Sequence, residues 1–264
     1  MQNSSLNFDR AADIYDATRS LPPQVARALA DLLEREVREA GGRLLEVGVG
    51  TGRITRPLAA RGVRVCGLDI SRRMMDKLRE QVGAGDVAPD LILSDATRVP
   101  FAGGAFSAVI ASHVLHLVSS WKTALEEIRR VLRPGGIFIN TWRDYPDGSP
   151  YTPHADKWEE LLARRGLRRG RRGPDSEEFA SVLSALGARA RMEKAAEWEA
   201  TEDLETLLQE TRNRIHSWSW ELPDEVFETC YKEYEPWARQ TLPERAVCYQ
   251  VQQVEIWTFA GRGR

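Results

Sequence analysis

The sequence predicts an α/β fold built on a parallel β-sheet with helices on both faces. Short runs that are apolar throughout alternate with segments of helical length in the first half of the chain, as a parallel sheet covered on both sides requires. The stretch "LLEVGVGTGRIT" at residues 44–55 adds three closely spaced glycines after one of these runs. This pattern is typical of a buried strand that turns sharply into a helix beneath a ligand.

The elements of the first half follow in order along the chain. Residues 22–40 carry apolar side chains at helical spacing, with two prolines in the first turn and two glycines as the stop, and predict an amphipathic helix. Residues 119–133 predict a second helix, which we expect "PGG" at 134–136 to end. Strands are expected at the apolar runs 43–49, 62–70, 90–95, 106–113 and 135–142.

The second half predicts more helix than strand. Helices are expected near 152–166, 175–186, 202–214 and 223–239, and strands at 188–200 and 246–260. We expect residues 143–173 and 201–240 to form a helical lid over the carboxyl edge of the sheet. Without a repeat or a clear linker, residues 1–142 are interpreted as the ligand-binding core and 143–264 as the completion of the same domain.

Composition excludes several classes of protein. The 264 residues, 42% of them hydrophobic, suffice for one large core, and a net charge of -2 gives no overall attraction to nucleic acid or acidic lipid. The three cysteines are widely spaced and predict neither a disulfide framework nor a zinc site. The chain shows no signal-peptide pattern at its start and no apolar run near the ~18 residues that span a bilayer. We expect a soluble, cytoplasmic protein without membrane insertion.

The spacing of the glycines argues against a phosphate-containing ligand on this loop. A dinucleotide fingerprint would need glycine at position 53, where this chain has Arg53, and no lysine follows the glycines as in a phosphate-binding loop. Glycines without a Cβ atom at Gly48 and Gly50 would let a ligand approach the backbone closely. The alternative is a tight structural turn with no ligand.

Acidic residues at the ends of two strands indicate a nucleoside. Asp69 ends the second strand about 20 residues past the glycine loop, where a carboxylate can accept hydrogen bonds from both ribose hydroxyls. Asp95 ends the third strand and could accept a proton from an adenine amino group, with Ile70 and Ala96 flanking the ring. Alternatively, Asp69 only caps the helix that begins near Ser71.

Five stretches, in this order and spacing, resemble the class I S-adenosylmethionine-dependent methyltransferases: "LLEVGVGTGRIT", "CGLDIS", "ILSDATRVPF", "FSAVIASHVLHLV" and "RVLRPGG". The chain looks like their small-molecule branch, type 11, which includes ubiquinone and menaquinone biosynthesis enzymes. The resemblance covers residues 8–141 and implies a Rossmann-like, seven-stranded, mostly parallel sheet whose last strand is antiparallel. It departs from the family at Ser107, where an acid often follows the aromatic residue.

The resemblance implies that S-adenosylmethionine is the cofactor and that a small-molecule acceptor is methylated on oxygen, nitrogen or carbon. By this resemblance the three glycines line the methionine part, and Tyr15 and Arg19 approach its carboxylate, although Arg19 could merely pair with a surface acid. The cofactor-binding residues expected in full are Tyr15, Arg19, Glu46, Gly48, Gly50, Gly52, Asp69, Ile70, Asp95, Ala96 and Ser112.

Two histidines follow the fourth strand, where the methyl acceptor should lie. His113 or His116 could act as a general base near neutral pH, or could simply pack against the next helix. No acid accompanies them to bind magnesium, so we expect no metal.

Two other functions stay open from the sequence. A cofactor-binding regulatory protein could keep the fold without turnover. A nucleic-acid methyltransferase is suggested only by an arginine cluster, which lacks interleaved aromatic residues and is interpreted as a solvated loop: Arg164, Arg165, Arg168, Arg169, Arg171 and Arg172. The chain has neither a [DNS]PP[YFW] motif nor a Pro-Cys pair, so we expect no nucleic-acid partner and a monomer or homodimer.

The tryptophans of the second half suggest an acceptor pocket. Trp218 and Trp220 occupy an expected turn between two helices of the lid, where alternation in an extended segment would point one of them inward. Such a pocket would favour an apolar or cationic acceptor. The alternative is that these side chains only pack the lid against the core.

Overall fold

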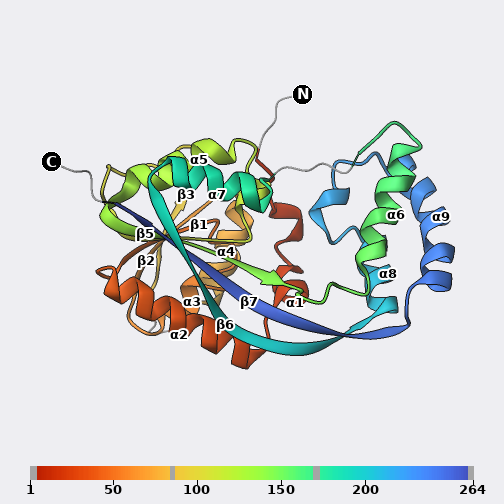
Figure 1. Cartoon of the computed structure of the whole chain (residues 1–264), viewed down its shortest axis with the longest axis horizontal. Coiled ribbons are helices and arrows are strands. Elements are labelled where there is room, and N and C mark those ends of the chain that lie inside the picture. The colour runs from red at the N-terminus through yellow and green to blue at the C-terminus, as the bar shows by residue number, and fades with distance from the viewer. Residues whose placement is uncertain (1–4, 84–86, 169–172, 261–264) are drawn as a thin grey trace. The chain divides into compact units, whose positions relative to one another are not determined.

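The structure, a computed structural model, describes residues 5–83, 87–168 and 173–260. A seven-stranded sheet has the order β3-β2-β1-β4-β5-β7-β6 (Figure 1), which confirms the predicted α/β class. The strands are β1 (Arg43–Val47), β2 (Arg64–Asp69), β3 (Asp90–Leu93), β4 (Phe106–Ser112), β5 (Leu132–Asp144), β6 (Ala188–Asp203) and β7 (Arg245–Phe259). The α-helices are α1 (Tyr15–Arg19), α2 (Pro23–Glu39), α3 (Thr55–Ala59), α4 (Arg72–Gln81), α5 (Trp121–Val131), α6 (Thr152–Ala163), α7 (Ser176–Ala185), α8 (Leu204–Arg212) and α9 (Asp224–Thr241). Short 3-10 turns are η1 (Asp9–Ala11), η2 (Leu115–Leu117) and η3 (Ser217–Ser219).

The sheet is mostly parallel. β1 pairs in parallel with β2 and β4, β2 with β3, and β4 with β5. β7 is antiparallel to β6, because Ala260 bonds to Gly187 just before β6 and Leu204 bonds to Glu244 just after it. β7 also runs antiparallel to β5 in Figure 1. The antiparallel last strand implied by the family resemblance is therefore confirmed.

The chain divides into two compact units. Unit 1 comprises residues 1–143, 172–196 and 252–264, and unit 2 comprises residues 144–171 and 197–251, as far as these ranges are described. Both units draw on the second half of the chain. The interpretation of the whole chain as one domain stays a prediction.

In unit 1, helices cover both faces of the sheet because successive side chains of a strand point to opposite sides. From β1, Leu45 and Val47 pack on the face covered by α5 and α7, and Leu44 packs on the face covered by α2 and α3. β4 repeats this alternation with fully buried residues. The resulting rigid layers hold the carboxyl ends of the parallel strands in place.

Unit 2 has its own aromatic core among α6, α8 and α9. Trp158 is fully buried and stacks on Phe227 with ring centroids 5.4 Å apart, and Tyr234 packs against the same indole. Throughout the described part of the chain, every helix is too short or too polar to span a bilayer.

The end of α5 differs from the prediction. The helix stops at Val131, and the "PGG" segment belongs to β5, which already begins at Leu132 and pairs there with Phe106. Pro134 is the physical reason, because the residue before a proline is held in extended conformation. Ser107, where the sequence departs from the family, has a structural role. Its hydroxyl accepts a hydrogen bond from the Arg43 N–H and donates one to the Arg43 carbonyl, each at 2.9 Å.

We expect Gly52→Ala to destabilise the chain strongly. Gly52 has φ +83°, and an added Cβ would collide with the Leu78 side chain. The left-handed backbone costs about 1 to 2 kcal/mol and overpacking a further 1 to 3 kcal/mol. Urea unfolding should therefore show a loss of about 2 to 5 kcal/mol.

Gly62→Ala is the matched control, since Gly62 has φ +79° but nothing within 4 Å of an added Cβ. It should show only the backbone cost of about 1 to 2 kcal/mol. Equal losses in the two variants would contradict the packing argument.

Candidate functional site

The Asp69 carboxylate connects the loops that follow β1 and β2. Its Oδ2 accepts a hydrogen bond from the Gly50 N–H at 2.8 Å, and its Oδ1 accepts one from the Ser71 N–H at 2.8 Å. Burial raises the pKa of Asp69, while the bonds from Ser71 and Gly50 oppose this rise. The alternative that Asp69 only caps the next helix holds in part, since Asp69 accepts the Ser71 N–H. The N-cap of α4, however, is the Ser71 side chain. A carboxylate has about four acceptor positions, so capacity remains for a ribose hydroxyl.

The glycine loop adopts a backbone that favours glycine. Gly48, Gly50 and Gly52 all have positive φ. A Cβ at Gly48 would collide with Val114, so glycine is required there by contact within the protein. At Gly50 the nearest atom to an added Cβ is 3.4 Å away, in Met74. Only Gly50 therefore matches the expectation that a missing Cβ leaves free space beside the loop.

Glu46 of β1 lies near Asp69 and the start of α3. It is 2% exposed, and its carboxyl accepts a hydrogen bond from the Thr55 hydroxyl at the start of α3. Burial raises the pKa of Glu46 to about 8, and the nearby charge of Asp69 adds to the rise. Glu46 is therefore mostly protonated at neutral pH, and a cation placed beside it would favour its ionised form.

The loop after β3 brings Asp95 and Ala96 to the same edge of the sheet. Asp95 Oδ1 accepts hydrogen bonds from the N–H and the hydroxyl of Thr97, at 2.8 and 2.7 Å. Burial alone would raise the pKa of Asp95, but these bonds lower it, so the carboxylate is ionised. Ala96 is buried and Ile70 is half-buried, as side chains beside a ring would be.

The helix α1 is anchored to the glycine loop by Asp16, which the sequence analysis missed. Its carboxylate accepts a hydrogen bond from the Thr51 hydroxyl at 2.5 Å and one from the Gln81 side chain at 3.0 Å. This anchor fixes the helix that carries Tyr15 and Arg19, which are both half-buried. An acid between these two residues was the only signal in the sequence.

The N-terminal segment, residues 6–9, was also missed. Leu6 donates a backbone hydrogen bond to Leu117 at 3.0 Å, and Asp9 accepts one from the Ser71 hydroxyl at 2.5 Å. These partners follow β4 and β2, which flank β1 in the sheet. The segment therefore passes across the carboxyl end of β1, above the glycine loop.

The residues after β4 include the predicted bases. His113 is half-buried and has φ +52°, a strained backbone for a residue other than glycine. Burial lowers the pKa of His113 to about 4, and nearby positive charges add to the effect. His116 is exposed, and Gly173 lies directly against its backbone. Ser112 bonds to the Thr141 hydroxyl at 2.8 Å.

The two tryptophans predicted to bind the acceptor belong to unit 2. Trp218 packs against Trp158 with ring centroids 4.9 Å apart, and the Trp220 indole donates to the Arg214 carbonyl at 2.7 Å. Residues 217–219 form a 3-10 turn, so the expected alternation of an extended segment is wrong. The packing of Trp218 favours a structural role, and the lid stays a prediction.

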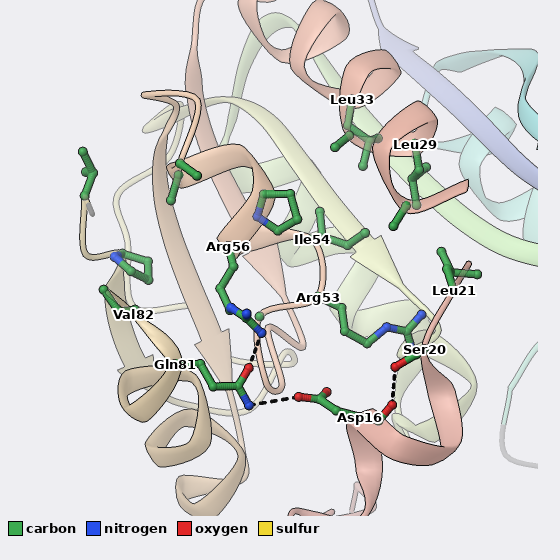
Figure 2. A pocket seen from close by; sticks show the side chains of 18 residues that line it. Asp16, Ser20, Leu21, Leu29, Leu33, Arg53, Ile54, Arg56, Gln81 and Val82 are labelled. Atoms are coloured by element: carbon green, nitrogen blue, oxygen red, sulfur yellow. Dashed lines mark hydrogen bonds between the residues drawn. The ribbon is translucent and has the colours of Figure 1, made fainter. Parts of the chain in front are cut away.

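A cavity of about 510 Å³ lies beside the glycine loop in unit 1 (Figure 2). Apolar side chains of α2 and α3 line it, together with Arg53 and Arg56. The segment between β1 and α3 contributes Gly52, Arg53 and Ile54, and neither Asp69 nor Asp95 lines the cavity. The cavity therefore shares Asp16, Gly52 and Arg53 with the strand-end site but does not reach these two acids.

The arginine cluster shows surface ion pairs where it is described. Arg164 pairs with Glu160 and Glu233, and Arg165 pairs with Glu233. Arg169, Arg171 and Arg172 lie outside the described residues. Within the described ranges, no group of three or more His, Cys, Asp or Glu side chains could hold a metal ion.

Comparison with known proteins gives a family match. Residues 45–140 match the model described as "Methyltransferase domain". The chain is 35% identical over 132 residues to the malonyl-[acyl-carrier protein] O-methyltransferase of Serratia marcescens, covering 50% of this chain and 49% of that protein. It is 35% identical over 139 residues to the demethylmenaquinone methyltransferase of Clavibacter sepedonicus, covering 51% and 56%. The chain spans about half the length of these relatives.

A solved structure shares the fold. The crystal structure of an S-adenosylmethionine-dependent methyltransferase from Thermotoga maritima, a possible histamine N-methyltransferase, matches with a TM-score of 0.50. The match covers 95% of this chain and 97% of that chain, at 18% sequence identity.

We expect the stability difference between Glu46→Gln and the wild type to depend on pH. The folded state keeps a proton on Glu46 that the unfolded state loses above its ordinary pKa of 4.5. Stability from this group is therefore fully present at low pH and is lost as the pH rises toward about 8. Glutamine can still accept the Thr55 bond but cannot ionise.

Urea unfolding at pH 5 and pH 8 without ligand should show the variant gaining about 3 kcal/mol relative to the wild type across that range. A difference that stays constant with pH would mean that Glu46 ionises normally.

Proposed function

We propose that this chain, whose residues 45–140 match the "Methyltransferase domain" family model, binds S-adenosylmethionine and transfers its methyl group to a small molecule. The observation that carries the proposal is the Asp69 carboxylate, held in place by Gly50 and Ser71 at the end of β2. Because this carboxylate is already fixed, binding of a ribose there costs little side-chain entropy.

The neighbouring groups fit the rest of the cofactor. Glu46 would receive the cationic methionine part, and uptake of that cation would lower its pKa and release a proton near neutral pH. Asp95 with Ala96 would take the adenine, and Tyr15 with Arg19 the carboxylate. Residues 6–9 would cover the bound cofactor.

The cofactor supplies a methyl group already activated by its sulfonium. The protein has to align the acceptor with that group, exclude water and, where the acceptor carries a proton, remove it. His113 is the better placed base, because it is half-buried at the end of β4 and neutral at pH 7. Its low pKa makes it a weak base. His116 is more exposed.

The acceptor class is proposed from the relatives. They are named for malonyl-[acyl-carrier protein] and demethylmenaquinone, so small acceptors or acceptors on a carrier suit the family. We further propose that the protein acts in the cytoplasm as a monomer or homodimer and not on nucleic acid. The free cysteines and the ion-paired Arg164 and Arg165 support this.

The alternative is a regulatory protein that binds the cofactor without turnover. Its fold and its cofactor affinity would be the same. Incubation with labelled cofactor and an extract of small metabolites separates the two, because only an enzyme yields a product heavier by one CH2 unit.

We expect Asp69→Ala to weaken cofactor binding by about 10- to 150-fold, the effect of losing a charge-assisted hydrogen bond. Isothermal calorimetry with S-adenosylmethionine measures the change. The cofactor affinity of Asp69→Asn should lie between those of Asp69→Ala and the wild type, because one oxygen acceptor remains.

Asp90→Asn, at the opposite end of β3, is the control and should bind as the wild type does. Absence of binding by the wild-type protein, or tight NAD binding in its place, would overturn the proposed function.

We expect His113→Asn to lower turnover by about 10²-fold or more, since general bases contribute at that scale. Asparagine tolerates the positive φ of this position. In the wild type saturated with S-adenosylmethionine, kcat/KM for the acceptor should stay flat from pH 8 to pH 5 and fall only as the pH approaches about 4, where His113 takes up a proton.

His116→Ala should change turnover little. Full activity in both variants would show that alignment alone drives the transfer.

A further inference from the structure

Three arginines place positive charge near His113, the residue that follows β4. Arg53 follows the glycine loop, Arg19 ends α1, and Arg143 lies near the end of β5. All three are half-buried. Neither Arg53 nor Arg143 was among the site residues predicted from the sequence.

The sheet register places Arg143 at the acceptor edge. Ser112 is the register partner of Thr141 in the parallel pair β4–β5, and their hydroxyls are hydrogen-bonded. Side chains two residues apart in a strand share a face, so Arg143 lies on the face of Thr141. Continuing this register puts Trp142 opposite His113 and Arg143 one residue further along, close enough for its charge to act on His113.

Arg53 is an unusual cation. Among the described residues it makes no hydrogen bond or ion pair, and its guanidinium contacts the Tyr15 ring with 5.9 Å to the centroid. In Figure 2 its side chain extends toward Ser20 and the end of α1. A half-buried guanidinium without a carboxylate partner is stabilised when a ligand supplies the anion.

The electrostatic surroundings of His113 agree with this geometry. Beyond burial, the charged groups that lower its pKa most are Arg53, His116, Arg143 and Arg19, and all of them are cationic or become so on protonation. A positive field therefore acts where the acceptor should lie.

The nearby acids do not cancel this field. Glu46 is protonated at neutral pH, Asp69 is engaged by backbone N–H groups of two loops, and Asp16 is bonded to Thr51. S-adenosylmethionine brings one carboxylate but also a sulfonium and an ammonium group. Its net charge of +1 is offset by the proton that Glu46 would release on binding, so the positive field at His113 is the field of the arginines.

Given the proposed function, we infer that the methyl acceptor is an anion whose acid group, a carboxylate or a phosphate, lies between Arg53 and Arg143 beside His113. Guanidinium groups bind both acids through paired charge-assisted hydrogen bonds. A cationic acceptor, which the expected tryptophan pocket would favour, would be repelled at this position.

The test uses the full chain saturated with S-adenosylhomocysteine and four probes of equal chain length. Hexanoate and hexyl phosphate are the anions, hexanamide is the neutral match and hexylamine is the cation. Calorimetry should show that one or both anions bind about tenfold or more tightly than hexanamide and hexylamine. The stronger anion identifies the acid group.

Arg53→Gln and Arg143→Gln should each weaken binding of the preferred anion by about tenfold while S-adenosylhomocysteine affinity stays within about twofold of the wild type. Arg129→Gln, an exposed position on α5, removes the same charge elsewhere and should leave both affinities unchanged. Melting temperatures establish that the variants are folded.

Several results would overturn the inference. These are no binding of any probe, equal binding of anions and hexanamide, or anion binding that survives both substitutions. A loss of S-adenosylhomocysteine affinity in Arg53→Gln with anion binding intact would assign that guanidinium to the cofactor instead. Failure of the wild type to bind S-adenosylhomocysteine at all would refute the proposed function, which is a separate outcome.

Discussion

The site depends on one carboxylate that holds two loops together. Asp69 ends β2 and accepts hydrogen bonds from Gly50 in one loop and Ser71 in the other. Ser71 in turn caps α4 and donates to Asp9 of the N-terminal segment. One anchor therefore holds the glycine loop, the start of α4 and the N-terminal segment, residues 6–9. A substitution at Asp69 would affect all three.

The fold could be predicted from the sequence because its signals are local. Apolar runs located the strands, and helical periodicity located α2 and α5 to within a few residues. The "PGG" stop was misjudged because Pro134 restrains the residue before it, and the extended backbone then pairs with β4. The turn that carries Trp218 was expected, but its extended alternation was wrong, because residues 217–219 form a 3-10 turn and a segment this short shows no periodicity in the sequence.

The site could be predicted only in part, for a physical reason. Residues in consecutive motifs, such as Asp69, follow strand ends that the sequence marks. Asp16 and Arg53 act through contacts with elements far along the chain, and the sequence gives no sign of which partner they meet. The anionic acceptor that we infer likewise depends on charges from α1, the glycine loop and β5, and the sequence does not show that these charges meet near His113.

The N-terminal segment has a consequence for synthesis. Asn7 and Asp9 meet partners that lie 63 and 62 residues further along the chain, and Leu6 bonds to Leu117, further still. Residues 6–9 leave the ribosome before any of these partners exist. Each of these contacts must close a loop of 62 residues or more, and the Leu6 bond needs Leu117, which follows β4. The N-terminal segment therefore has its full set of contacts only after Leu117 has been made, and a nascent chain interrupted earlier would lack the Leu6 contact.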